Sequence, residues 1–544
     1  MIELLQHLLI VPILVPLLIG ALQLFLTARR GLRIACALGS VLVQAAAAFT
    51  LLYLTTDSMP HMWTEGVGVY SLGSWPAPFG IVLVVDRLAA LMLVLTSMVA
   101  LAALVYSLAY WESAAPAFHS LFQFLLMGLN GAFLTGDLFN LFVFFEVLLA
   151  SSYGLLLHGS GAGRVKASLH YVAVNLVASF LFLIGVAMIY GMTGTLNMAD
   201  LAGRIALLAP EDRALFESGA AILGVAFLIK AGVWPLNLWL SATYTAASSP
   251  IGAVFSLMTK VGVYAILRVG TLLASGSEQT SFIDVGLFYG GAATIVYGVV
   301  GILASHQLGR IVSLYVVSST GLLFMAIGLR VDALTGPVML YLVSSVLATA
   351  AFFMVNGLLQ RTRTLRVREA ADLGPMPDDI YLGFSAQGKA DPLSPNDEVG
   401  IALPAAMAFL GLTFVCCVLL VAGLPPLSGF LAKFALLRMA LEQTSSAGTS
   451  WHTWAFCAAV LATGVAALVS LTRVGARLFW AVRGRTIPRL RVVEAAPPAF
   501  LIILCVALTV GAGPVMSYLE SAATSLHSPQ VYIRVVNATQ QALP

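Results

Sequence analysis

Charged residues are scarce in this chain. Asp, Glu, Lys and Arg make up 9% of its 544 residues, whereas apolar residue types make up 60%. A soluble domain carries about 25% charged residues, so this composition excludes a surface that faces water over most of its area. Together with apolar runs long enough for spanning helices, it predicts an all-α polytopic membrane protein.

Cysteines, basic clusters and catalytic motifs are also few or missing. The five cysteines lie in apolar runs without metal-ligand spacing or a disulfide framework, and we expect small core residues there. The net charge is only +3, and no Lys/Arg cluster alternates with aromatic residues, which excludes a nucleic-acid groove. The segment GSGAG near Gly159 lacks the lysine of a phosphate loop. The sequence therefore predicts no catalytic role in the chemical sense, no cofactor and no metal.

Long hydrophobic runs are what the sequence does have. A spanning helix needs about 20 apolar residues, and fourteen segments meet that requirement. They lie near residues 4–27, 34–55, 88–110, 118–136, 138–158, 168–192, 219–240, 251–274, 283–304, 311–330, 334–359, 402–440, 453–480 and 497–519. Pro235 in the seventh, and Pro425 with Pro426 in the twelfth, remove backbone donors and clash with the preceding turn. We therefore expect broken helices in spans 7 and 12.

Basic residues in the connections predict the orientation of the spans. They follow spans 1, 5, 9, 11 and 13 more often than even-numbered spans. Cytoplasmic loops are the ones enriched in Lys and Arg, so both termini are predicted on the non-cytoplasmic side of the membrane. The connection 361–398 is the longest cytoplasmic one, and its Pro, Gly and Asp content predicts partial disorder.

Four charged side chains deep in the apolar segments stand out as candidates: Glu146, Lys230, Lys260 and Lys433. A charge in hydrocarbon costs about 2.5–3.5 kcal/mol, so each needs a partner, a water-filled cavity or a function. Asp137 begins span 5, and nine helical residues place Glu146 about 13–14 Å further along, near the bilayer centre. Lys230 and Lys260 lie at similar depth in spans 7 and 8. Burial favours a neutral amine and a nearby carboxylate favours the ammonium, so a Glu146–Lys230 pair predicts a proton switch that feeds Lys260.

Less specific interpretations of these charges exist. A Glu–Lys pair can simply lock helices together, and lysines can extend to an interface. Four charges beside helix breaks favour a function, because half-helix ends and freed carbonyls at midplane hold ions and water. Hydroxyl groups are expected to bridge the lysines through water, although each alone is typical of helix packing. These residues are Ser256, Thr259, Ser318, Ser319, Thr320, Ser344 and Ser345.

The breaks also suggest internal repetition. Lys230 precedes Pro235 and Lys433 follows Pro426, so each half of the chain has a lysine beside a proline break. We therefore expect two inverted five-helix repeats. The predicted organisation is spans 1–3 (1–117), a first repeat of spans 4–8 (118–274), a second of spans 9–13 (275–480) containing the linker 361–398, and a last span with a tail (481–544).

Three motifs resemble the antiporter-like membrane subunits shared by respiratory complex I and the Mrp (Pha) multisubunit cation/proton antiporters. They are FNLFVFFEVLLASSYGLL, LIKAGVWPLNLWLSATYTAASSPIGAVFSLMTKVGVYAILRV and AGLPPLSGFLAKFALL, within a resemblance that covers about residues 82–536. Three further stretches resemble the D subunits of the Mrp (Pha) antiporters rather than the subunits of complex I. They are GSWPAPFGIVLVVDRL, GTLNMADLA and VGAGPVMSYLESAATSLHSPQVYI.

The resemblance implies roles for the charged residues. Glu146 matches the family's span 5 glutamate and Lys230 the span 7 lysine with which it pairs. Lys260 matches the proton relay of span 8, and Lys433 the span 12 lysine that faces the exit. Asp137 matches an acidic position near the start of span 5.

Two departures from the family pattern concern the second half. Span 11 has Ser344, Ser345 and Thr349 where many relatives have histidines and a lysine. Before span 10 the chain reads SHQLGR, where relatives often have an acidic–basic pair. The relay between Lys260 and Lys433 is therefore expected to depend on hydroxyls and water.

The expected function is that of a proton-translocating subunit in a heteromeric antiporter that exchanges protons for Na⁺ or K⁺. Its expected partners are the other subunits and membrane lipid. An alternative is a proton-pumping subunit of a redox-driven NADH:quinone oxidoreductase or membrane-hydrogenase complex. A third interpretation is a scaffold whose charges only hold helices together.

Overall fold

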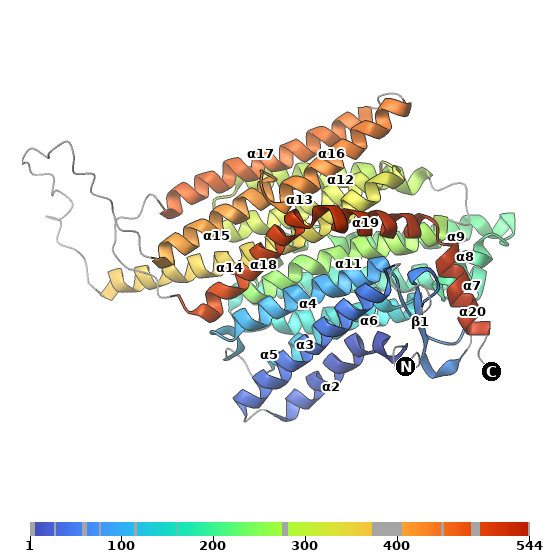
Figure 1. Ribbon diagram of the computed structural model, residues 1–544, viewed down its shortest axis with the longest axis horizontal. Helices are drawn as coiled ribbons and strands as arrows, with labels where there is room; N and C mark the ends of the chain where they lie inside the picture. Colours follow the sequence, from blue (N-terminus) through green and yellow to red (C-terminus); the bar gives the residue numbers. More distant parts are fainter. Residues whose placement is uncertain are drawn as a thin grey trace, which may run out of the picture.

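Long helices lying side by side make up most of the computed structural model (Figure 1). It describes residues 6–26, 29–56, 63–75, 78–113, 117–159, 161–274, 281–372, 405–447, 451–479 and 490–541. Within these residues, twelve helices are long and apolar enough to cross a membrane, and two shorter apolar helices bring the number to fourteen. The all-α polytopic fold with about fourteen spans is confirmed.

The fourteen apolar helices are α2 (Val11–Phe25), α3 (Arg30–Leu54), α4 (Arg87–Ser107), α5 (Phe118–Leu134), α6 (Leu138–Leu157), α7 (Ala162–Thr193), α9 (Pro210–Ala231), α11 (Ser249–Ala274), α12 (Ser281–Ala304), α13 (Leu308–Ile327), α14 (Thr335–Asp372), α15 (Ala405–Ala422), α17 (Trp451–Phe479) and α18 (Val492–Val510). The other helices are η1 (His7–Leu9), η2 (Thr64–Gly66), η3 (Leu72–Ser74), η4 (Trp111–Ser113), α8 (Met198–Ile205), α10 (Leu238–Ala246), η5 (Asp332–Leu334), α16 (Ser428–Ala447), α19 (Ala512–His527) and α20 (Gln530–Gln541).

A small antiparallel hairpin is the exception to the helical pattern. β1 (Gly68–Ser71) and β2 (Val82–Val85) lie between α3 and α4, and Gly68 pairs with Val85. Leu83 of β2 forms a bridge with Thr135 at the end of α5. The hairpin therefore fixes the α3–α4 connection to the neighbouring helix end.

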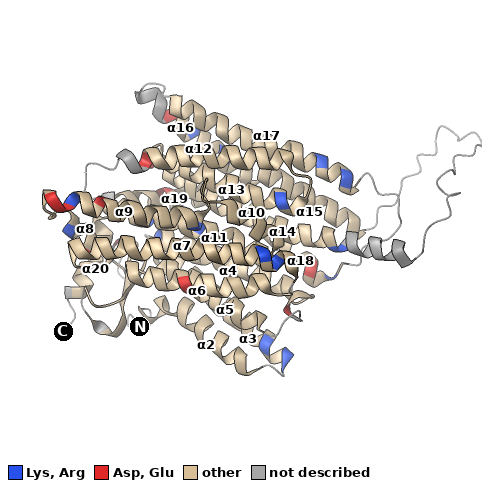
Figure 2. Ribbon diagram, turned by 180° about the vertical axis from the view of Figure 1, so that it is seen from behind, with Lys and Arg blue, Asp and Glu red and all other residues tan. Residues whose placement is uncertain are grey.

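Charged residues gather at the two ends of the helix bundle, and the middle is almost free of colour in Figure 2. η1 and α20 lie at one end, whereas the last turns of α14 lie at the other (Figure 1). The first and last described helices therefore lie at the same end of the bundle. Which side of the membrane that is stays a prediction.

Three boundaries differ from the sequence prediction. The seventh span begins at Pro210 rather than near residue 219, because proline is well suited to the first helical turn, where no donor is needed. α14 stays helical to Asp372, so the linker predicted from residue 361 begins later, and residues 373–398 lie outside the described ones. The last span, predicted to reach residue 519, ends at Val510, and α19 begins as a separate helix at Ala512.

The two predicted helix breaks are present. α9 and α15 both end at an alanine followed by a glycine, and Gly232 and Gly423 have φ angles of 74° and 77°. Left-handed backbone of this kind favours glycine and ends a helix. The chain then passes Pro235 before α10, and Pro425 and Pro426 before α16.

Helix neighbours follow the same order in the two halves of the bundle. α5 packs on α6, α6 on α7, α7 on α9 and α9 on α11. In the second half α12 packs on α13, α13 on α14, α14 on α15 and α16, and α15 on α17. Because each unit has five spans, equivalent helices run in opposite directions, which agrees with two inverted repeats.

Candidate functional site

Glu146 lies in the middle of α6. The helix begins after Asp137, whose carboxylate accepts a hydrogen bond from the backbone N–H of Asn140 at 2.8 Å and so caps it. Glu146 is half-buried, and its Oε1 accepts a hydrogen bond from the Ser179 hydroxyl of α7. The carboxylate is thus held between two neighbouring helices.

Lys230 lies in the last turn of α9, next to the break. Its Nζ is 5.4 Å from the centre of the Phe145 ring, a cation–π distance. The charge of Glu146 is close enough to act on this lysine, but within the described residues no ion pair of 4.0 Å or less joins the two. The structure therefore brings the two groups near each other without direct contact.

A cavity of about 30 Å³ lies beside Lys230. A water molecule needs roughly 10–15 Å³ of such space and polar partners, so the cavity has room for water. Trp239 supplies a buried indole N–H that has no hydrogen-bond partner in the described part of the chain. The remaining lining residues are Phe145, Leu148, Leu149, Tyr171, Asn175, Met258 and Val261.

Lys260 of α11 is buried against α13, with 1% of its surface exposed. Its Nζ donates to Ser319 Oγ at 2.7 Å and to Thr320 Oγ1 at 2.9 Å. Both hydroxyls in turn donate to the carbonyl of Val316. The Nζ therefore rests on neutral acceptors that are themselves fixed to a helix backbone.

Lys433 of α16 turns back toward the break that precedes it. Its Nζ donates to the carbonyls of Val421 at 3.2 Å and Ala422 at 3.1 Å. These are the last carbonyls of α15, which have no partner inside the helix and lie at the negative end of its dipole. The backbone carbonyls at the end of α15, where the span is interrupted, are therefore the acceptors for this lysine.

The other predicted hydroxyl residues divide into two groups. Ser344 of α14 hydrogen-bonds Ser428 at the start of α16, at 2.9 Å. The rest donate to carbonyls three or four residues earlier in their own helices. They are Ser256, Thr259, Ser318, Ser345 and Thr349.

Sequence reasoning missed three polar residues near the site: Ser179, Ser428 and Asn237. Asn237 lies between Pro235 and α10 and is 0% exposed. Its amide oxygen and nitrogen both lack partners among the described residues. A buried amide in this state usually bonds ordered water, and its place just after a proline break was the available clue.

Comparisons with known proteins identify the family. Residues 135–377 match the family model described as NADH:quinone oxidoreductase/Mrp antiporter, TM. The chain is 48% identical to the probable D subunit of the K(+)/H(+) antiporter of Rhizobium meliloti, over 98% of both chains. The chain belongs to the antiporter D-subunit family. It is also 32% identical to the D subunit of the Na(+)/H(+) antiporter of Bacillus subtilis, over 97% of this chain and 98% of that one.

Solved structures give the same result for the fold of this D-subunit family member. A chain of the Mrp complex from Dietzia sp. DQ12-45-1b matches with a TM-score of 0.80 and 25% identity, covering 98% of this chain and 99% of that one. A chain of respiratory complex I from Thermus thermophilus matches with a TM-score of 0.70 and 21% identity, covering 98% and 100%. The sequence relatives are transporter subunits rather than enzymes, and the likeness to the redox complex is one of fold alone. The predicted resemblance to the D subunits of Mrp antiporters is confirmed.

Proposed function

We propose that this chain moves protons through the membrane as one subunit of a heteromeric antiporter that exchanges H⁺ for Na⁺ or K⁺. The names of its relatives support exchange of either cation, because the 48% identical relative is named for K⁺ and the 32% identical relative for Na⁺. Other subunits of the complex and the lipid of a bacterial plasma membrane are its partners.

The arrangement of the three lysines carries this proposal. Lys230, Lys260 and Lys433 come from three helices, and each contacts a different acceptor: an aromatic face, two hydroxyls and two backbone carbonyls. Among the described residues none of the three has an ion-pair partner within 4.0 Å. A lysine with neutral partners loses and gains a proton more easily than one fixed in a salt bridge.

The proposed transfer begins at Glu146. When its carboxylate is ionised and close, it stabilises the ammonium of Lys230; when the two separate, Lys230 releases its proton to water in the adjoining cavity. Water at Asn237 and the serines of α13 and α14 then carries protons to Lys260 and on to Lys433. Ser344 and Ser428 provide a hydroxyl pair on the last part of this route.

The test is cation-dependent proton flux in everted vesicles that carry the full complex. Glu146→Gln and Lys230→Ala should each abolish the flux while the complex still assembles. Lys166→Gln is the matched control, because Lys166 is an exposed lysine at the start of α7. Undiminished flux in either site variant would refute the relay.

Two other functions are separated by related measurements. A member of a redox-driven complex would pump only when NADH or a reduced carrier is supplied, and the fold likeness to complex I motivates this control. An antiporter needs only an imposed ion gradient. If Glu146→Gln prevents assembly instead of transport, the charges serve as a scaffold.

A further inference from the structure

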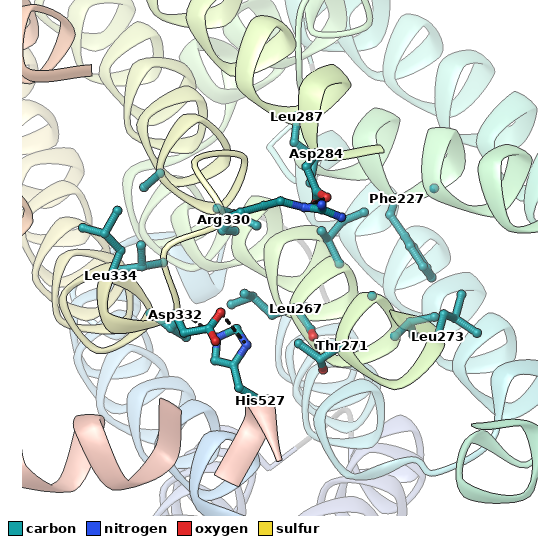
Figure 3. Close-up of a pocket in the computed structure, with 18 of the residues that line it drawn as sticks. Phe227, Leu267, Thr271, Leu273, Asp284, Leu287, Arg330, Asp332, Leu334 and His527 are labelled. Carbon is teal, nitrogen blue, oxygen red and sulfur yellow. Dashed lines mark hydrogen bonds and ion pairs between the residues drawn. The ribbon is translucent and has the colours of Figure 1, made fainter. Parts of the chain in front are cut away.

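A second, larger cavity lies away from the three lysines, at the end of the bundle where α20 is found. Its volume is about 490 Å³, in the range of small-molecule sites. α9 and α11 of the first repeat line it together with α12, α13 and α14 of the second. Figure 3 shows side chains from these helices pointing into one space. The cavity therefore lies where the two repeats meet.

Most residues that line this cavity are apolar, and its charged side chains come from the start of α12 and the α13–α14 connection. Phe227, Leu267 and Leu287 form part of the wall (Figure 3). A path for hydrated ions needs polar groups through its whole depth. The lining instead fits a molecule with a long apolar part and a polar end.

The mouth carries charges of both signs. Asp284 forms an ion pair with Arg330, and Asp332 lies 3.3 Å from Nδ1 of His527 (Figure 3). The Asp332 side chain is 77% exposed and that of Arg330 45% exposed, so both can be reached by a ligand. Two carboxylates beside one guanidinium disfavour a purely anionic group and suit a group with both charges.

The position of the cavity points to lipid as the source of such a molecule. The outer faces of α9 and α12 carry exposed apolar side chains, among them Val225, Val285 and Val296. Helices with apolar outer faces border hydrocarbon in a membrane. α11 and α14, by contrast, are almost entirely buried and form the inner walls. The cavity is thus next to the acyl chains, with its charged mouth at the level of head groups.

We propose that this cavity binds a phospholipid with an amine-bearing, zwitterionic head group. One acyl chain occupies the space between α9, α11 and α12. The phosphate accepts hydrogen bonds from Arg330, and the ammonium group lies against the carboxylate of Asp332. The site does not depend on the proton route, because it shares none of the lysines.

Two glycines provide a way to fill the cavity. Gly224 and Gly270 both line it, and a Cβ atom added at either position would meet no heavy atom within 4 Å. Leucine at these positions therefore extends into the cavity without a backbone clash. Gly191 of α7 is the matched control, because it also has open space around it but faces outward, away from the cavity lining.

The experiment uses the full complex in vesicles that contain phosphatidylethanolamine with a photoactivatable group in its acyl chain. After illumination, mass spectrometry should find adducts on residues 220–227 of α9 and 266–273 of α11. Gly224→Leu and Gly270→Leu should lose most of these adducts, whereas Gly191→Leu should keep them. Adducts of equal yield in the filled variants, or adducts confined to other helices, would overturn the proposal.

The head group is tested with phosphatidylglycerol that carries the same acyl probe. The amine-bearing lipid should label the cavity more strongly, and Asp332→Asn should reduce its labelling by about tenfold, the ratio for one charge-assisted hydrogen bond. Asp332→Asn should raise the weaker phosphatidylglycerol labelling, because it removes a carboxylate that repels the anionic head group. Equal labelling by the two lipids in the wild-type complex would overturn the head-group assignment. The labelled positions in the unsubstituted complex decide the location even where a variant fails to assemble.

Discussion

The two broken helices hold their lysines in opposite ways. In the first half, Lys230 precedes the break at Gly232 and has a carboxylate nearby on another helix. In the second half, Lys433 follows the break at Gly423 and its ammonium nitrogen lies on the carbonyls that the break has freed. The first lysine can respond to a charge on a neighbouring helix, whereas the second responds to the backbone of its own span.

Lys260 lies between these two cases. Its acceptors are side-chain hydroxyls of α13, which carry no net charge and can be removed by substitution. The three environments differ in what a mutation can take away: a charge, a hydroxyl or a backbone conformation. Each therefore gives a separate test of the comparison.

Among variants that keep Glu146 and the three lysines, the largest effect is expected from Ser319→Ala combined with Thr320→Val. Each hydrogen bond to a charged group is worth about 1.5–3 kcal/mol, so losing both should lower proton flux by about 100-fold or more. Thr96→Val in α4 is the control, because this buried hydroxyl donates to a carbonyl of its own helix and lies outside the proposed route. Flux is measured in everted vesicles, and a double variant with normal flux would show that Lys260 does not need α13.

A smaller and more selective effect is expected from alanine at the two break glycines. Gly232→Ala and Gly423→Ala each place a side chain in left-handed backbone, at a cost of about 1–3 kcal/mol, so both should lower the thermal stability of the purified complex. At Gly423 the new Cβ would lie 2.5 Å from Cδ of Lys433, whereas at Gly232 it would lie 2.5 Å from Cδ1 of Leu240.

Proton flux should therefore separate these two variants. Gly423→Ala displaces the lysine and should lower flux beyond its loss of assembled protein, and Gly232→Ala should lower flux only in proportion to that loss. Flux per assembled complex is the quantity to compare. Equal values for the two variants would mean that the carbonyl contacts of Lys433 are not used in transport.

The smallest effect is expected from Ser179→Ala. The half-buried Glu146 would lose one hydroxyl donor, worth about 1.5 kcal/mol at the lower end for a charged group, and flux should fall by roughly tenfold. Ser168→Ala in the same helix is the control, since its buried hydroxyl has no partner among the described residues. A fall as large as that of Glu146→Gln would assign Ser179 to the proton route itself.

Much of the architecture was predictable from the sequence because the physics is local. Hydrocarbon requires runs of about 20 apolar residues, and proline and glycine interrupt a helix wherever they stand. The number of spans, the breaks in spans 7 and 12 and the place of Glu146 in the middle of its helix follow from these rules. The start of α9 was missed, because a helix can continue past its apolar part when proline and acidic residues stabilise its first turn.

The sequence alone determined the helices, the breaks and the charged residues that lie inside the membrane. Only the tertiary structure decided which groups meet: Ser179 with Glu146, two hydroxyls with Lys260, and freed carbonyls with Lys433. It also decided that α9 and α11 enclose a largely apolar cavity together with α12, α13 and α14. Helices that are apolar all round carry no pattern that fixes which face meets a neighbour, so these contacts depend on packing between helices far apart in the chain.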